Sequence, residues 1–196
     1  DTSLEESFET LTRWQSDGLI ARIGVSNFAA WQVMKAQAVA HRLGTKIDAI
    51  QPMYSLVKRQ AEVEILPMAT DQGITAYTYS PLGGGLLSGK YASGGAGRLT
   101  EDARYAARYA PPAMHEAAAG LARIAAEVGV DAATLAVAWV MGCPITPVIP
   151  LISARDAPQL APSLAAAGFV MDEGLRARLS ALFPAPPPAT DRIEEA

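Results

Sequence analysis

Four short apolar runs rich in β-branched residues, each followed by polar residues and then by a helical pattern, constrain the fold of this chain most. They cover 19–25, 49–52, 74–79 and 148–151. Strands alternating with helices indicate a parallel sheet, because parallel strands need long crossover connections. Ligands of such folds collect at the carboxyl ends of the strands, so we expect the polar strand ends at one rim. An open doubly wound sheet and half of an eightfold barrel both satisfy this pattern.

The segments between these runs predict helices. Ser3 and Glu6 form a capping box, and Asp131 is placed as the N-cap of a later helix. Pro67 cannot lie deep in a regular helix, so the helix over 60–72 has an irregular first turn or starts near residue 64. The other helices are predicted from residue 4 to before residue 18, and over 29–43, 112–128, 132–141, 157–166 and 172–182. A polar excursion over 92–98 and an extended Pro-rich tail over 184–196 complete the chain.

Composition limits the classes of protein to which the chain can belong. Its 196 residues, of which 50% are hydrophobic and 18% charged, suit a single domain or a large part of one. A net charge of −4 provides no general basic field for a nucleic acid. Cys143, the only cysteine, excludes an internal disulfide, suits a reducing compartment and is expected to be buried. With no apolar run of membrane-spanning length and no signal-peptide pattern, we expect a cytoplasmic protein without a membrane partner.

The tryptophans and histidines have structural interpretations. Trp14, Trp31 and Trp139 lie on helical patterns and are expected to pack in the core or between helices. His41 and His115 lie outside the strand ends, so we expect hydrogen-bonded or solvent-facing side chains. Neither residue type points to a metal site.

The segment 75–91 (TAYTYSPLGGGLLSGKY) is the strongest candidate for a ligand site. A strand would fix Tyr79, whose flat ring offers a stacking face, and Pro81 would stiffen the exit from that strand. Three consecutive glycines, 83–85, would let backbone N–H groups approach an anion closely. The segment therefore predicts a cradle for an anionic cofactor, although an unliganded surface turn would use the same residues.

The candidate residues also have other interpretations. Gly84, Gly89 and Lys90 are spaced almost as in a P-loop, but Tyr91 replaces the magnesium-binding Ser or Thr and the strand ends too early. Ser26 and Asn27 could cap the following helix, and Arg155 could be a solvated residue at a helix start. Gln51 is harder to explain in this way, because an amide on a short buried strand needs hydrogen-bond partners.

Four linked motifs resemble the aldo-keto reductase family in order and spacing, over nearly the whole chain. They are 23–28 (IGVSNF), 50–55 (IQPMYS), 79–91 (YSPLGGGLLSGKY) and 149–155 (IPLISAR), followed by Gln159. The resemblance implies a (β/α)8 TIM barrel of which this chain, 1–196, supplies the second half, strands 5–8 with their helices. It also implies NADPH bound at the strand ends without a Rossmann glycine fingerprint, in a reductase of aldehydes or ketones.

The resemblance assigns the cofactor contacts by position. Ser26, Asn27 and Gln51 would bind the nicotinamide carboxamide, and Tyr79 would stack on the nicotinamide ring. The pyrophosphate would be wrapped by Ser80, Pro81, Leu82, Gly83, Gly84 and Gly85, and approached by Lys90 and Arg98. Arg155 and Gln159 would lie near the 2′-phosphate, and Ser163 near the adenine. A guanidinium favours NADP over NAD because it can form a bidentate pair with a phosphate.

This chain departs from the pattern of the family at the catalytic acid. The family's catalytic Tyr, with Lys, Asp and His, lies on the first four barrel strands, so none of these residues is expected in this chain. Tyr54 and Tyr79 match binding positions instead. The expected partners are a small carbonyl substrate and the N-terminal half-barrel or an equivalent chain. The alternatives are a non-catalytic nicotinamide-binding subunit, as in potassium-channel β-subunits, and a truncated half-barrel without activity.

Overall fold

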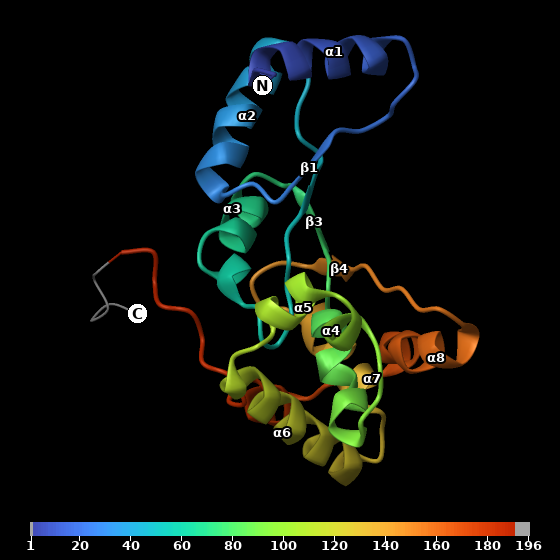
Figure 1. The fold of residues 1–196 in the computed structure, drawn as a ribbon. Helices are drawn as coiled ribbons and strands as arrows, with labels where there is room; N and C mark the ends of the chain where they lie inside the picture. The colour runs from blue at the N-terminus through green and yellow to red at the C-terminus, as the bar shows by residue number, and fades with distance from the viewer. Residues whose placement is uncertain (1, 191–196) are drawn as a thin grey trace.

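The chain forms a four-stranded parallel sheet with helices packed along it (Figure 1). The computed structural model describes residues 2–190, apart from the side chain of residue 93. The strands are β1 (Gly24–Ser26), β2 (Ala49–Gln51), β3 (Thr75–Thr78) and β4 (Val148–Pro150), and they neighbour one another in chain order. Ser26 pairs with Gln51, and Thr78 with Pro150, so the carboxyl ends of the strands form one rim. The prediction of a parallel α/β sheet is confirmed.

The helices follow the strands in the predicted alternation. The α-helices are α1 (Leu4–Ser16), α2 (Ala30–Arg42), α3 (Ile65–Asp71), α4 (Arg98–Glu101), α5 (Ala103–Arg108), α6 (Pro112–Val128), α7 (Ala132–Met141), α8 (Ala157–Ala165) and α9 (Glu173–Ser180). Short 3-10 turns are η1 (Gln60–Glu62), η2 (Gly83–Ser88), η3 (Lys90–Ser93) and η4 (Ala166–Gly168). Five of these helices have an N-cap side-chain oxygen that accepts a hydrogen bond from the first turn, on Ser3, Asp102, Asp131, Asp156 and Asp172.

One face of the sheet is buried and the other is exposed within the described chain. Along β3, Ala76 and Thr78 are buried, whereas Thr75 and Tyr77 are exposed, as the two-residue repeat of a strand dictates. Tyr77, Ile149 and Leu151 remain 36%, 46% and 40% exposed. This burial pattern shows that helices cover one face of the sheet, whereas the face with these apolar side chains is open. Parallel sheets, in contrast, ordinarily bury both faces.

The buried face of the sheet and the helices share one hydrophobic core. It takes Val33 and Ala36 from α2, Leu66 from α3, Leu121 from α6 and Leu135 from α7. Apolar residues three and four apart on these helices form the stripe that packs on the sheet. The sheet is thus anchored on one side, and the loops at its carboxyl rim are held on a rigid base.

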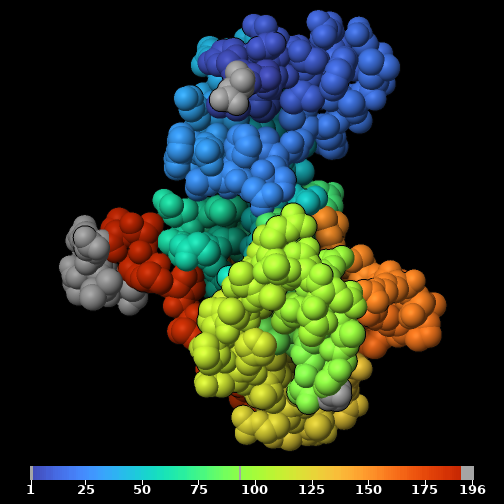
Figure 2. Space-filling model, in the orientation of Figure 1, coloured from blue at the N-terminus to red at the C-terminus, as the bar shows by residue number. Residues whose placement is uncertain are grey.

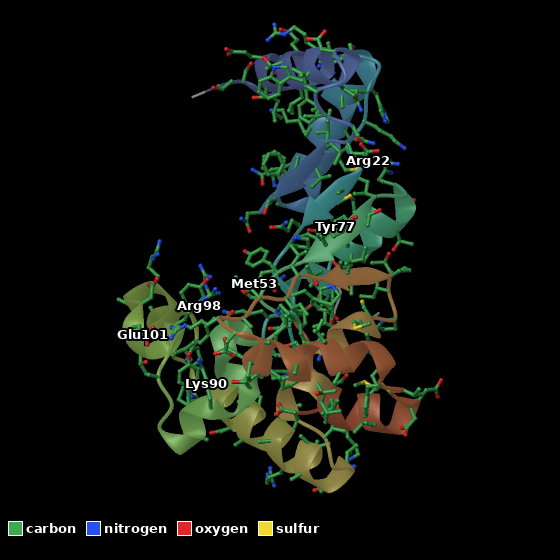
Figure 3. All side chains as sticks on the ribbon, turned by 90° about the vertical axis from the view of Figure 1, so that its right-hand side faces the viewer. Arg22, Met53, Tyr77, Lys90, Arg98 and Glu101 are labelled. Atoms are coloured by element: carbon green, nitrogen blue, oxygen red, sulfur yellow. The ribbon has the colours of Figure 1, made fainter. Side chains whose placement is uncertain are left out.

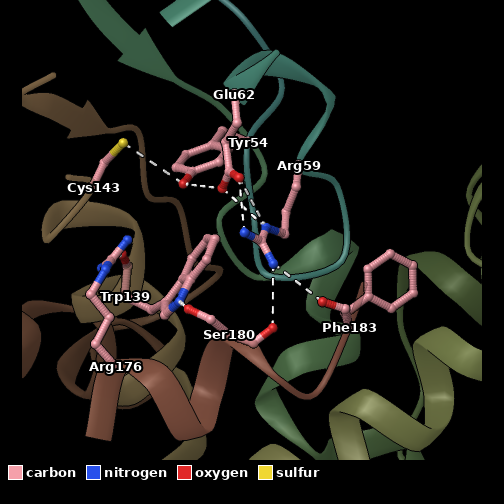
Figure 4. Close-up of polar contacts among 8 residues, drawn as sticks. All are labelled: Tyr54, Arg59, Glu62, Trp139, Cys143, Arg176, Ser180 and Phe183. Atoms are coloured by element: carbon pink, nitrogen blue, oxygen red, sulfur yellow. Dashed lines mark hydrogen bonds and ion pairs between the residues drawn. The ribbon is translucent and has the colours of Figure 1, made fainter. Parts of the chain in front are cut away.

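A buried polar cluster joins the loop after β2 to the C-terminal helix (Figure 4). The Tyr54 hydroxyl donates to Glu62 over 2.7 Å, and Arg59 pairs with Glu62 over 2.9 Å. Arg59 also donates to the carbonyl oxygens of Ser180 and Phe183. Burial, reinforced by Cys143 and Glu62, raises the pKa of Tyr54 well above its usual range, so its hydroxyl stays protonated.

An aromatic ring lies at the centre of this polar cluster. Trp139, 1% exposed, packs at a centroid distance of 5.3 Å from Tyr54 and donates to the Ser180 hydroxyl. The guanidinium groups of Arg59 and Arg176 lie over its ring at 5.5 and 5.1 Å. These cation–π contacts stabilise the packing of α9 and of the loop after β2 against α7.

The structure corrects several sequence predictions. The strands are shorter than predicted, and the excursion after η2 contains α4 and α5, which no apolar periodicity indicated. Trp14 and Trp31 are 42% and 66% exposed, so only Trp139 is the predicted core residue. Cys143 is half-buried beside the Tyr54 hydroxyl, not fully buried. Of the tail, residues 191–196 lie outside the described residues.

Other predictions are confirmed in detail. The helices α6 and α7 have the predicted bounds, and Pro67 lies in the first turn of α3, which starts just after residue 64. Between residues 2 and 190, no single helix is both long and apolar enough to cross a membrane. The helices α6 and α7 pass that test only as a pair bent by 100°.

Candidate functional site

The carboxyl rim of the sheet brings together residues from separate strand ends. Tyr79 directly follows β3, and its hydroxyl donates to Asn27 Oδ1 over 2.6 Å; Asn27 directly follows β1. The hydrogen bond therefore reaches across the end of β2. The Ser26 hydroxyl donates to the backbone carbonyl oxygen of Gln51 over 3.0 Å. The structure thus brings together Ser26, Asn27, Gln51 and Tyr79, as the sequence analysis expected.

Two residues of this rim adopt left-handed backbone conformations without being glycine. Asn27 and Ser80 both have φ of 59°. Asparagine tolerates this region, whereas serine is held there at some cost in conformational energy. Strain of this kind clusters at functional sites. At Ser80 it turns the chain sharply out of β3 and into the glycine loop.

The glycine loop after β3 depends on glycine at three successive positions. Gly83, Gly84 and Gly85 have φ of 56°, 66° and 95°, all in the left-handed region. A Cβ atom on Gly84 would come within 2.9 Å of Tyr105 Cδ1. Tyr105 and Tyr109, from the segment around α5, thus pack directly against the loop backbone. Any other residue at Gly84 would be strained and would also displace this packing.

Tyr91 ties the glycine loop to the excursion that contains α4. Its hydroxyl donates to the Gly84 carbonyl oxygen and accepts from the Leu99 backbone N–H, each over 3.2 Å. A Cβ on Gly97, which precedes α4, would overlap the Lys90 and Tyr91 side chains. The start of α4 is therefore packed tightly against η3. Figure 2 shows this excursion on the surface between the loop after β2 and α8.

The predicted phosphate-binding cations lie around this loop. Lys90 Nζ lies 4.9 Å from the centroid of the Tyr91 ring. The Arg98 and Arg108 guanidinium groups lie 5.4 and 5.2 Å from the Tyr105 centroid. Figure 3 shows Lys90, Arg98 and Glu101 in one region of the molecule, below and to the left of Met53 and away from Arg22. The loop thus has cationic side chains around it, with Lys90 directly beside Gly85.

Arg155, in the loop after β4, already has an acidic partner. Its Nη2 lies 2.9 Å from Glu101 Oε2, at the end of α4. Its backbone N–H donates to the Gln159 side-chain oxygen over 2.8 Å, and the Gln159 N–H donates to Asp156. Arg155 and Gln159 are thus brought together as predicted. The ion pair also links the excursion after β3 to the loop after β4.

Three predicted residues offer a ligand little of their side chains. Pro81 is buried and Leu82 half-buried, so these two shape the turn and pack beneath it. Ser163 on α8 is 5% exposed. A hydroxyl so enclosed has little surface for an adenine, whereas the exposed Gln159, one turn earlier, is accessible.

The sequence analysis missed several residues that shape the site. Glu101, Tyr91, Tyr105 and Tyr109 were not predicted, because α4 and α5 carry mixed polar and small residues without a clear apolar stripe. The available signal was the density of aromatic and basic residues over 98–109 (RLTEDARYAARY). Burial raises the pKa of Tyr109, whose ring lies against Gly83. Tyr109 is therefore a packing residue of the loop.

The arrangement can hold a bulky anionic ligand along the rim. The left-handed glycines bring the loop backbone close to a ligand, although the Gly83 and Gly85 N–H groups donate to the carbonyl oxygens of Ser80 and Leu82. Nearby cations offset phosphate charge, and Tyr79 offers a fixed aromatic face. These features fit a nicotinamide dinucleotide. Within residues 2–190, no group of three or more His, Cys, Asp or Glu side chains is placed to bind a metal ion. A surface hollow lined by Gln15, His41 and Asp48 lies at the amino ends of the strands, away from this site.

Comparisons with known proteins give the relatives of the chain. A sequence model described as "Aldo/keto reductase family" matches residues 1–182. The chain is 36% identical over 185 residues to the uncharacterized oxidoreductase YrpG of Bacillus subtilis (strain 168), covering 92% of this chain and 53% of that protein. It is 32% identical over 193 residues to the protein tas of Escherichia coli (strain K12), covering 94% and 55%.

A third relative has a different kind of name. The chain is 33% identical over 148 residues to a probable voltage-gated potassium channel subunit beta of Oryza sativa subsp. japonica, covering 70% of this chain and 44% of that protein. The chain thus spans about half the length of these relatives, or less.

Proposed function

This chain belongs to the aldo/keto reductase family, and from that premise we propose that it carries most of the NADPH site of an oxidoreductase that reduces aldehydes or ketones to alcohols. The observation that carries the proposal is the hydrogen bond from Tyr79 to Asn27 across the sheet rim, directly before the glycine loop. It holds an aromatic face and a phosphate cradle on one continuous edge. Oxidoreductase relatives support the reaction class.

Each rim residue has a proposed role. Ser26, Asn27 and Gln51 orient the carboxamide, and the Tyr79 ring packs against the nicotinamide. The loop from Ser80 to Gly85 holds the pyrophosphate with Lys90 and Arg98, and Arg155 with Gln159 holds the 2′-phosphate. When bound, the nicotinamide supplies the hydride that reduces the carbonyl carbon. These contacts orient the cofactor and exclude water from its reactive face.

We further propose that the four strands are half of an eight-stranded barrel and that the proton donor lies on the other half. The open apolar face with Tyr77, Ile149 and Leu151 supports this, because parallel sheets ordinarily bury both faces. The strands β1 and β4 are edges of the sheet in the described chain, and unpaired edges invite further strands. The greater length of the relatives agrees with such a partner. Steady turnover by these 196 residues alone would contradict this proposal.

We expect Tyr79→Ala, in the protein at its full natural length, to weaken NADPH binding about tenfold, because a stacking face is worth roughly 1–1.5 kcal/mol. The matched control is Tyr79→Phe, which keeps the ring and loses only the hydrogen bond to Asn27. Fluorescence titration with NADPH measures both affinities. Unchanged binding by Tyr79→Ala would refute the assignment of the ring.

Similarity to the rice channel subunit favours a second function, a nicotinamide-binding subunit without turnover. The two functions differ in a single assay. A reductase oxidises NADPH steadily in the presence of a simple aldehyde, whereas a binding subunit shows NADPH affinity with no turnover above the background rate. We favour the reductase because the similarity to YrpG and to the protein tas covers more than nine-tenths of the chain, and YrpG is named as an oxidoreductase.

A further inference from the structure

Arg155, which the proposed function assigns to the 2′-phosphate, forms an ion pair with the carboxylate of Glu101. The two residues are 54 positions apart and come from different connections of the sheet. Both side chains are accessible, at 71% and 50% exposure, so a ligand can reach the pair. A guanidinium binds carboxylates and phosphates through the same N–H donors, so the Glu101 carboxylate and a 2′-phosphate are alternative partners of Arg155.

Glu101 is held at this position by its own helix. The Leu99 N–H donates to the Tyr91 hydroxyl, which donates in turn to the Gly84 carbonyl oxygen. The Gly97 N–H donates to the Thr100 hydroxyl oxygen, and the Asp102 side chain caps α5 directly after Glu101. Glu101 therefore lies in a turn between α4 and α5 that these hydrogen bonds hold in place. Through Tyr91, the same bonds connect this turn to the backbone of the glycine loop.

The other charged groups nearby are engaged elsewhere. Asp156 accepts from the Gln159 N–H as the N-cap of α8, and Asp102 pairs with Arg104. Arg98 lies over the Tyr105 ring. Among the described residues, the ion pair recorded for Arg155 is the one with Glu101. The charge of Glu101 thus acts directly on this guanidinium.

We propose that Glu101 is a cofactor-selectivity residue, whose carboxylate competes with the 2′-phosphate for Arg155 and so weakens binding of NADP(H) relative to NAD(H). This inference rests on the proposed function. A 2′-phosphate must displace the carboxylate and then lies close to its negative charge. A ribose 2′-hydroxyl is neutral, so NAD(H) meets no such repulsion and leaves the ion pair in place.

The exposure of the pair limits the size of the effect. An accessible ion pair is weak and screened by salt, so Glu101 reduces a preference and does not block the site. The protein is therefore expected to accept both NADPH and NADH. Its discrimination between them is set by whether Arg155 is free or neutralised.

The test compares nucleotide affinities of wild-type protein, Glu101→Gln and Glu127→Gln, each at full natural length. Glu127 pairs with Arg178, and both side chains are more than half exposed, so Glu127→Gln makes the same charge change in another accessible ion pair. NADPH and NADH are titrated separately by calorimetry at low and high salt. Thermal unfolding of each variant checks that the fold is retained.

We expect Glu101→Gln to bind NADPH roughly fivefold more tightly, with NADH affinity changed by less than about twofold. The Glu127→Gln control is expected to match the wild type for both nucleotides. High salt should shrink the NADPH difference, because screening weakens the repulsion. Glu101→Lys should tighten NADPH binding further, which gives a second variant of the same residue.

Other outcomes separate the two proposals. Unchanged or weaker NADPH binding in Glu101→Gln, by a protein that binds NADPH, would overturn the role of Glu101 and leave the proposed function intact. Equal changes for NADPH and NADH would also overturn it, since they indicate a general effect on the rim. If the wild type and every variant bind neither nucleotide, the proposed function and the selectivity role both fall.

Discussion

Replacing Arg59 by methionine is expected to lower the free energy of unfolding by about 3 kcal/mol, because it leaves the Glu62 carboxylate nearly buried without its cation. The Arg59 and Glu62 side chains are 13% and 15% exposed and pair over 2.9 Å. The substitution also removes the donors to the Ser180 and Phe183 carbonyl oxygens and one cation over Trp139. Urea unfolding of the protein at full natural length measures the change.

The chain offers a matched control for Arg59. Arg178 also pairs with a glutamate, Glu127, but both side chains are more than half exposed. Arg178→Met should cost less than about 1 kcal/mol, as accessible ion pairs generally do. The double variant Arg59→Met with Glu62→Gln should recover part of the loss, because no uncompensated carboxylate remains. Equal losses for Arg59→Met and Arg178→Met would contradict the stabilising role of the buried cluster.

Replacing Gly84 by alanine is expected to destabilise the protein by about 3 kcal/mol, the sum of backbone strain and overpacking. Its φ of 66° disfavours any Cβ, and that Cβ would lie 2.9 Å from Tyr105 and 3.1 Å from Leu99. We also expect weaker NADPH binding, because the loop and α4 must move apart. Urea unfolding and fluorescence titration measure the two effects.

Gly73→Ala separates strain from crowding. Gly73 has a φ of 62°, close to that of Gly84, but a Cβ there would meet nothing within 4 Å. It should cost only about 1 kcal/mol, which is the strain contribution alone, and should leave NADPH affinity unchanged. If both alanine variants lose the same stability, crowding against Tyr105 contributes nothing and the packing argument for the loop fails.

Local patterns were sufficient for the elements with strong signals. The helices α6 and α7 were predicted with their bounds because each combines an N-terminal signal, Pro112 or Asp131, with apolar residues, at helical spacing in α6 and almost throughout in α7. The strands were located but overestimated in length, since apolar and aromatic residues continue beyond the paired residues at one or both ends of each strand. Trp14 and Trp31 were placed wrongly, because helical spacing does not reveal which face of a helix meets the core.

The candidate site divides in the same way. Tyr79 and the glycines were predicted because backbone requirements leave a local signature, whereas Arg155 was assigned by the family resemblance. Tyr91 and Glu101 were not, since their roles depend on α4 folding back onto the loop. Ser163 was expected near the adenine, but the packing of α8 buries its side chain. Accessibility is set by neighbours that are distant in the sequence.

The sequence by itself determined the alternation of strands and helices, the parallel sheet and the residues at its carboxyl rim. These features follow from local propensity, capping and the geometry of crossover connections, which act over a few residues. Only the tertiary structure decided that Tyr79 bonds to Asn27, that Arg155 is paired with Glu101 and that one sheet face is open. Such contacts join segments more than 50 residues apart, and their formation depends on how the whole chain packs.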